Sequence, residues 1–217
     1  HGVLRLRVMP YWADEDAAVA EHELRRVGFR DVQQPDGTHA STLRLDIAGR
    51  ADGALFGDQV KSRLRLAEKA GVTARRGTAE DWPALRSMHA ALMRSQGLRE
   101  KPQAWWAALQ AFSADDRRGA LFACDLGERL VAAAVILRHG SQATYSWGAS
   151  IPDKMPFTKA IPPLVAAIRW SREAGCATFD LGGIPLEEDH DPKRNAIAAF
   201  KLYFTKSRVR LVREHGK

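Results

Sequence analysis

The chain has 217 residues, of which 45% are hydrophobic, enough for a buried core in one large domain or two small ones. Its 33 Lys and Arg residues exceed its 26 Asp and Glu residues, and the net charge of +7 permits contact with a nucleic acid or a pyrophosphate. A GC-rich genome also produces an Arg- and Ala-rich chain, so the charge is compatible with either explanation. No apolar run has the length of a transmembrane helix, and we therefore expect no membrane span.

The N-terminus has neither an initiator Met nor the long apolar stretch of a signal peptide. We therefore expect the sequence to begin inside a longer protein, within an N-terminal domain whose first half precedes it; a tag remnant at His1-Gly2 is the alternative. Cys124 and Cys176 lie in apolar contexts typical of buried, reduced thiols. The seven histidines show no metal-ligand spacing, so we expect neither a metal nor a cofactor.

Hydrophobic periodicity predicts alternating strands and helices over the first 71 residues. The expected elements are a strand at 3–9, a helix at 14–27 that ends at Gly28, strands at 29–33 and 41–47, and a helix at 55–70 closed by Gly71. This β-α-β-β-α order is half of a mixed α/β unit.

Residues 72–214 show a longer order, β-α-α-β-β-β-α-β-α-β. After a strand at 72–76, Thr78 and Asp81 have the spacing of a capping box, with Asp in place of the usual Glu. The inward faces of the next two helices are expected to hold Trp82, Leu85, Met88 and Leu92 in the first, and Trp105, Leu109 and Phe112 in the second, which Pro102 opens. The later elements are expected at 120–125, 130–137 and 143–149 (a meander), 157–174 (helix), 176–181 (parallel strand), 195–204 (helix) and 207–212 (strand).

The last helix and the strand before it contain the most informative residues. Gly182-Gly183 at the strand end lets backbone N–H groups approach a ligand closely, because neither residue has a Cβ. In the helix, Lys201 follows Phe200 in a stretch where Ile197, Phe200 and Phe204 are expected to form the buried face. A lysine at the edge of such a face either extends into solvent or faces a ligand cavity.

These two segments resemble the C-terminal signature of the FemAB/FemX family, the aminoacyl-tRNA-dependent transferases that build peptidoglycan interpeptide bridges. In that family a D-x-G-G-I strand end leads through a variable loop into an F-K-x-x-F helix, and residues 180–184 (DLGGI) and 200–204 (FKLYF) follow this pattern. Residues 42–46 and 61–72 are similar to a second family passage, T-x-x-x-D-L … R-x-x-I-R-K-A-E-K-x-G-V. The likeness extends over residues 38–214.

The resemblance implies a mixed α/β fold of the GCN5-related N-acyltransferase (GNAT) type, with two such domains in tandem. We expect residues 1–71 to be the C-terminal half of a truncated first domain and residues 72–217 to be a complete second domain, whose last strand adds to the first. The implied donor is aminoacyl-tRNA, and the implied acceptor is a nucleotide- or lipid-linked cell-wall precursor. The implied location is the cytoplasm, with peripheral contact to the membrane as an option.

The resemblance also implies the site residues. Lys201 is expected to be catalytic, since a fixed cation stabilises the oxyanion of acyl transfer. Asp180 aligns with the family's acidic position and is the candidate base, with a structural role as the alternative. Substrate-binding positions are expected at Arg94, Tyr145, Gly182, Gly183 and Phe200.

Two other functions stay open. One is a GNAT-like N-acyltransferase that uses an acyl-CoA or acyl-carrier donor in exopolysaccharide or lipid biosynthesis. Acyl-CoA-dependent members of this fold bind the CoA pyrophosphate with a glycine-rich loop, whereas residues 150–159 contain two prolines and no glycine, which disfavours CoA. The other is a non-catalytic binding module.

Overall fold

The computed structural model describes residues 6–8, 12–32, 41–184 and 192–217. The chain forms two compact units: unit 1 comprises residues 1–44 and 181–217, and unit 2 comprises residues 45–180. The boundary between them falls within two strands, β3 and β8. The division at residue 71 into two family domains is based on the resemblance and stays a prediction.

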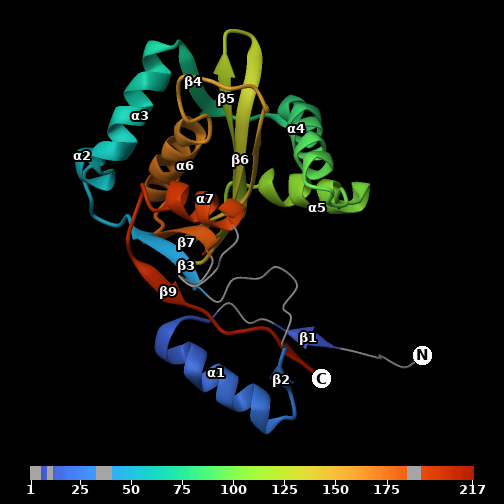
Figure 1. The fold of residues 1–217 in the computed structure, drawn as a ribbon. Coiled ribbons are helices and arrows are strands. Elements are labelled where there is room, and N and C mark those ends of the chain that lie inside the picture. The colour runs from blue at the N-terminus through green and yellow to red at the C-terminus, as the bar shows by residue number, and fades with distance from the viewer. Residues whose placement is uncertain (1–5, 9–11, 33–40, 185–191) are drawn as a thin grey trace. The chain divides into compact units, whose positions relative to one another are not determined.

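Unit 2 contains a sheet in the order β4-β5-β6-β7-β8 (Figure 1). Strands β4 to β7 are antiparallel neighbours, and β8 is parallel to β7, as predicted from the crossover through α6. The strands are β4 (Val72–Arg76), β5 (Gly119–Leu126), β6 (Arg129–His139), β7 (Gln142–Ser150) and β8 (Thr178–Ile184), and the helices are α2 (Asp52–Leu55), α3 (Asp58–Lys69), α4 (Trp82–Ser95), α5 (Gln103–Ser113) and α6 (Ile161–Glu173).

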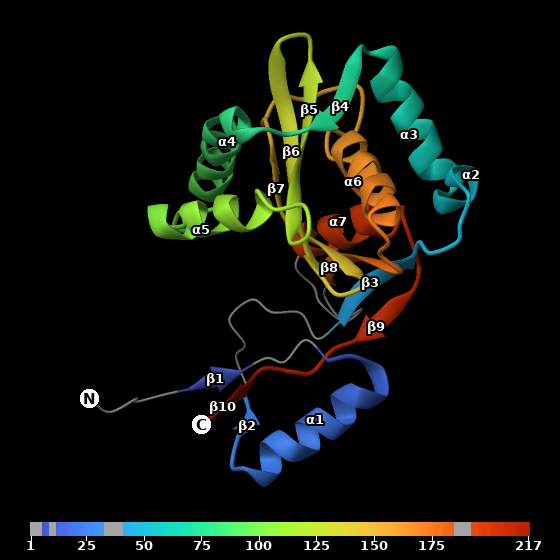
Figure 2. The same ribbon diagram turned by 180° about the vertical axis from the view of Figure 1, so that it is seen from behind.

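Helices cover both faces of this sheet. Figures 1 and 2 show α3 and α6 on one side of the strands, and α4 and α5 on the other. The strands β5 and β6 are buried on both faces: Leu121, Ala123 and Val135 are each at most 3% exposed. A sheet covered on both faces needs apolar residues along the whole strand, which explains the continuous apolar runs in these two strands.

Unit 1 contains the chain's two ends. Its elements are β1 (Arg7–Val8), α1 (Asp14–Arg26), β2 (Arg30–Asp31), β3 (Ser41–Asp46), α7 (Pro192–Lys201), β9 (Arg208–Arg210) and β10 (His215–Gly216). The short strands form a sheet in the order β1-β10-β2, and β3 pairs with β9 in the antiparallel direction. Ala17 and Ala20 of α1 pack with Val212 in a small core.

The predicted order of elements over residues 72–214 is confirmed, and β10 adds one short strand that the sequence did not predict. The expected helix at 55–70 is instead two helices, α2 and α3, because Phe56 and Gly57 are extended between them. The strand expected at 3–9 is described at Arg7–Val8; Leu6 is not part of it, and residues 3–5 and 9 lie outside the described residues. Cys124 and Cys176 are free and buried, as expected.

The capping box that precedes α4 is confirmed. The Thr78 N–H donates to Asp81 Oδ2 at 2.7 Å, and the Thr78 hydroxyl accepts from the Glu80 N–H at 3.3 Å. The box closes a short 3₁₀ turn, Ala79–Asp81, that leads directly into α4. Local side-chain chemistry therefore decides where this helix begins.

The predicted inward faces of α4 and α5 are confirmed at Trp82, Leu85, Met88 and Leu109, and they are wrong at one residue in each helix. Leu92 and Phe112 are 38% and 40% exposed, whereas His89 and Trp106 are almost fully buried. The buried face of each helix thus also includes His89 or Trp106, and the rings of these two residues pack against each other.

Candidate functional site

The glycine pair lies at the end of β8. Gly182 has a φ of 80°, a left-handed backbone conformation that side chains with a Cβ rarely adopt. The strand is otherwise apolar and buried, with Leu181 and Ile184 both inaccessible to solvent. Gly182 is therefore required by the backbone itself, which is typical of a strand end that turns towards a site.

Lys201 lies at the C-terminus of α7 and is only 8% exposed. Its ammonium donates a hydrogen bond of 2.7 Å to the carbonyl oxygen of Gly183. Both residues belong to unit 1, so this contact joins the helix directly to the glycine end of β8. A buried ammonium needs such an acceptor, because an unpaired charge in a protein interior is costly.

The face of α7 that is buried differs from the expected one. Ile197 is 52% exposed and Phe200 is half-buried, whereas Ala198 and Lys201 are buried; Phe204, which follows the end of the helix, is buried as expected. The helix is turned by one residue relative to its apolar stripe, which places the lysine inward. The prediction that Ile197 faces the core is wrong, and so is the interpretation of Lys201 as a solvated lysine.

Phe200 contributes to an aromatic group next to Lys201. Its ring centroid lies 5.9 Å from that of Phe204 and 6.4 Å from that of Tyr203, and both pairs meet nearly at right angles. Edge-to-face contacts of this kind fix ring orientation. The end of α7 is therefore held by aromatic packing on both sides of the lysine.

Asp180 and Tyr145 lie on neighbouring strands of unit 2. Asp180 is fully buried, and its register partner across the parallel pair is Thr144, the residue before Tyr145. The Tyr145 ring lies over Gly148 of its own strand, where a Cβ would come within 2.1 Å of the hydroxyl oxygen. Burial raises the pKa of Tyr145 to about 12, so its hydroxyl stays protonated and acts as a donor.

Arg94 occupies a different environment. It lies at the end of α4, is exposed, and its Nη1 donates to Glu100 Oε1 at 2.9 Å. The described structure thus groups Lys201, Phe200, Gly182 and Gly183 in unit 1, and places Asp180 in β8 directly before them in the chain. Arg94 and Tyr145 belong to unit 2, and their substrate-binding roles stay predictions. The acidic segment 185–191 lies outside the described residues.

The loop before α6 contains a residue that sequence reasoning missed. Lys159 donates to the carbonyl oxygens of Ile151 and Asp153, the latter at 2.6 Å, and burial lowers the pKa of its ammonium. At the start of α6, Pro162 and Pro163 have no N–H, and the Ile161 N–H donates to the Thr158 carbonyl at 3.1 Å. The sequence signal was a lysine two residues before a helix that opens with two prolines.

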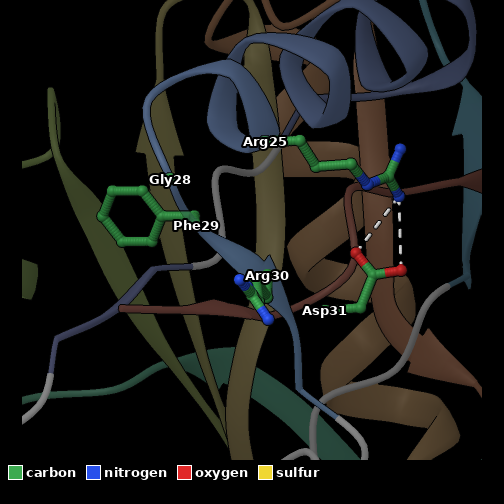
Figure 3. A pocket seen from close by; sticks show the side chains of 5 residues that line it. All are labelled: Arg25, Gly28, Phe29, Arg30 and Asp31. Atoms are coloured by element: carbon green, nitrogen blue, oxygen red, sulfur yellow. Dashed lines mark hydrogen bonds and ion pairs between the residues drawn. The ribbon is translucent and has the colours of Figure 1, made fainter.

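A separate hollow of about 460 Å³ lies in unit 1 (Figure 3). Arg25 faces Asp31 across it, with hydrogen bonds of 3.1 and 3.3 Å to the two carboxylate oxygens. None of the predicted site residues lines this hollow; the residues that do are Arg25, Gly28, Phe29, Arg30 and Asp31. Among the described residues, no cluster of His, Cys, Asp or Glu is placed to hold a metal ion, and none of the helices has the length and hydropathy of a membrane span.

Comparison with known proteins identifies the fold. The family model of the acetyltransferase (GNAT) domain matches residues 56–194, more than half of the chain. No curated protein sequence matches significantly.

Solved structures agree with this fold. The chain resembles FemX with a TM-score of 0.79 and 16% identity, over 98% of this chain and 71% of FemX. It also resembles the C-terminal domain of a protein assigned as a lysylphosphatidylglycerol synthetase from Agrobacterium fabrum (TM-score 0.60, 14% identity, 91% of this chain and 64% of that one). A tandem GNAT protein from the clavulanic acid biosynthesis pathway matches with a TM-score of 0.55 and 9% identity, over 98% of this chain and 63% of that one. The chain thus spans less than two thirds of the latter two structures, and these likenesses show the GNAT fold and its FemX-like, tandem form.

Proposed function

The chain belongs to the acetyltransferase (GNAT) domain family, a family of acyltransferases, and we propose that it forms an amide on an amine of a peptidoglycan or other cell-envelope precursor. The proposed donor is an aminoacyl-tRNA, and the proposed acceptor is nucleotide- or lipid-linked. Charged tRNA is a cytoplasmic donor, so the proposal places the reaction in the cytoplasm. The similarity of the fold to FemX and to the lysylphosphatidylglycerol synthetase domain supports this choice.

The observation on which the choice of donor rests is the closed start of α6. In acyl-CoA-dependent enzymes of this fold, free backbone N–H groups at this helix N-terminus bind the pyrophosphate. Here two of the first three N–H groups are replaced by proline, and the third is paired with Thr158. Lys159, two residues before this helix, donates to two carbonyls of the loop itself. This arrangement disfavours CoA and leaves the aminoacyl ester of tRNA as the preferred donor.

The reaction proposed is attack of the acceptor amine on the carbonyl carbon of the aminoacyl ester. A C–N bond forms, the C–O ester bond breaks, and the terminal ribose hydroxyl of the tRNA leaves with a proton, while the amine loses one. Lys201 is the proposed electrostatic catalyst. Its buried ammonium is held in place by Gly183, and a fixed cation in a water-poor site stabilises the developing oxyanion without rearranging.

The other predicted residues receive supporting roles in this proposal. Asp180 is the candidate acceptor of the amine proton, from its fully buried position two residues before Gly182. Gly182 and Gly183 allow the substrate to approach the backbone, and Phe200 fixes the position of Lys201. Tyr145 is proposed to donate a hydrogen bond to the precursor, and the exposed Arg94 to exchange Glu100 for a precursor phosphate.

The test is transfer of a radiolabelled amino acid from a mixture of charged tRNAs to a UDP-linked muropeptide. We expect label in the precursor with the wild type, and a loss of about 10²–10³-fold in kcat with Lys201→Ala, the effect of removing one oxyanion-stabilising group. Lys206→Ala is the matched control, because Lys206 is an exposed lysine five residues further along the same unit.

A second variant separates catalysis from folding. Lys201→Met keeps an unbranched stem but leaves the Gly183 carbonyl without its ammonium donor, which costs about 1–3 kcal/mol of unfolding free energy. Folded protein that fails to transfer places the role of Lys201 in catalysis. Saturable CoA binding, with consumption of an acyl-CoA and no transfer from tRNA, would instead support the acyl-CoA function.

A further inference from the structure

Three tryptophans and a histidine form one aromatic cluster in unit 2. His89 belongs to α4, Trp105 and Trp106 to α5, and Trp147 to β7. The ring centroids of Trp105 and Trp147 are 4.7 Å apart, and that of His89 lies 5.0 Å from Trp147 and 5.2 Å from Trp106. Each ring contacts at least two of the others, so both helices and the strand hold the cluster in a fixed arrangement.

The ammonium of Lys101 lies against this cluster. Its nitrogen is 5.9 Å from the ring centroid of Trp105 and 5.7 Å from that of Trp147. Both distances are within the roughly 6 Å at which an indole face attracts a cation. Lys101 itself is exposed and lies before the first residue of α5, so its side chain can move away while the helix stays intact.

The cluster also contains buried polar atoms that have no hydrogen-bond partner in the described part of the chain. His89 is only 2% exposed, and its Nε2 has no hydrogen-bond partner within the described part of the chain. The same is true of the Nε1 of Trp147. Burial, followed by the nearby charge of Lys101, lowers the pKa of His89, so the imidazole is neutral near pH 7 and keeps one nitrogen as an acceptor. Leaving buried polar atoms unpaired costs stability, and a ligand that reaches them is one explanation of their presence here.

We propose that Trp105 and Trp147 form an ammonium-binding subsite for the acceptor, and that Lys101 occupies this subsite until the acceptor displaces it. The assignment to the acceptor rests on the proposed function, whereas cation binding by the two rings does not. An ammonium has no lone pair and cannot attack an ester. The bound cation is therefore a second, non-reacting amine, and the substrate class is a precursor that carries more than one amino group.

The test uses n-pentylammonium, a primary ammonium one carbon longer than a lysine side chain, and pentan-1-ol as its neutral counterpart. Binding is followed by tryptophan fluorescence on the full chain. Lys101→Met keeps the apolar stem and removes the competing charge, and we expect it to bind n-pentylammonium about tenfold more tightly than the wild type. Pentan-1-ol should show no such gain, and Trp105→Leu in the Lys101→Met background should abolish it.

Two controls define the signal. Lys69→Met removes an exposed lysine of α3 and should leave the affinity for n-pentylammonium unchanged. Trp12→Phe removes an exposed tryptophan of unit 1 and should leave the fluorescence titration with n-pentylammonium unaltered. Equal affinities of wild type and Lys101→Met for n-pentylammonium, or an equal gain for pentan-1-ol, would overturn the proposal. The titration needs no acyl donor, so a tenfold gain combined with a failed transfer assay upholds the subsite and rejects the proposed function.

Discussion

Asp81 is held by Arg75 through two hydrogen bonds of 2.8 Å, and Arg75 also donates to Asp125 at 2.6 Å. The hydrogen bonds from Arg75 hold the pKa of Asp81 below its usual range, against the opposing effect of burial. A carboxyl group whose pKa is lower in the folded state binds protons less readily there than in the unfolded chain. Its contribution to stability is therefore present above the unfolded pKa of about 3.9 and is lost as the pH falls through the folded pKa.

We expect Asp81→Asn to lower the free energy of unfolding by about 1 kcal/mol near pH 6, since Arg75 is half-exposed and partly screened by water. The difference should begin to shrink as the pH falls below about 4 and should vanish once the pH is below the lower pKa of the folded state, where the wild-type carboxylate is protonated. Urea denaturation of both proteins at several pH values measures this difference. A difference that stays constant over that range would contradict the role of the charge. Asp115→Asn, at an exposed carboxylate, is the control.

At the scale of elements, the pairing of β5 with β6 depends on a glycine. A Cβ added at Gly119 would lie 2.4 Å from the carbonyl oxygen of Ile136 and 3.2 Å from a methyl carbon of Leu137. Backbone atoms of a paired strand cannot move aside as the end of a flexible side chain can. β5 and β6 therefore leave no room for a side chain at Gly119.

We expect Gly119→Ala to destabilise the chain by about 1–3 kcal/mol, the usual cost of overpacking. Thermal denaturation with two probes, circular dichroism and tryptophan fluorescence, measures the change. Gly53→Ala is the matched control: Gly53 lies in α2 with no atom within 4 Å of an added Cβ, and alanine there should stabilise by up to about 1 kcal/mol. Equal stabilities of the two variants would show that the strands can shift to admit the methyl group.

At the scale of the whole molecule, the net charge of +7 is an electrostatic property that the aminoacyl-tRNA proposal requires. A cationic protein that contacts several phosphates releases counterions, so its affinity for RNA falls steeply with salt. We expect the affinity for bulk tRNA to fall at least about tenfold between about 50 and 200 mM salt. Fluorescence anisotropy with end-labelled tRNA measures this slope. Absence of binding at the lower salt concentration would count against tRNA as the donor.

Much of the fold could be predicted because the determining signals are local. The strands β3, β4 and β7, the helix α1 with Gly28 at a φ of 90° and the Thr78–Asp81 box follow from residues within one turn or one strand. The prediction of one continuous helix through Phe56 and Gly57 was wrong because the local pattern was misleading there. An apolar periodicity continued through both residues, but their extended backbone ended one helix and began another.

The residues of the candidate site also fall into two groups: those that a local motif identified and those whose contacts depend on the tertiary structure. The motif pattern identified Gly182, Gly183 and Lys201 as residues of interest, and the structure joins Gly183 to Lys201 by a hydrogen bond. The resemblance carried no information on Lys159 or on the Lys101 contact, because each depends on atoms brought together by loops: the carbonyls of residues 151 and 153, and two indole rings on different elements.

The sequence by itself determined the order of the elements and identified the glycines and the lysine that mark the site. Only the tertiary structure decided where the margin of each buried face lies: His89 is buried and Leu92 exposed, Trp106 is buried and Phe112 exposed, and Lys201 is buried and Ile197 exposed. The physical reason is that helical periodicity defines a stripe about 100° wide, and the surface that receives the helix selects the part of it that turns inward. For Lys201, that surface provides the carbonyl oxygen of Gly183, eighteen residues away, without which a buried ammonium would be unstable.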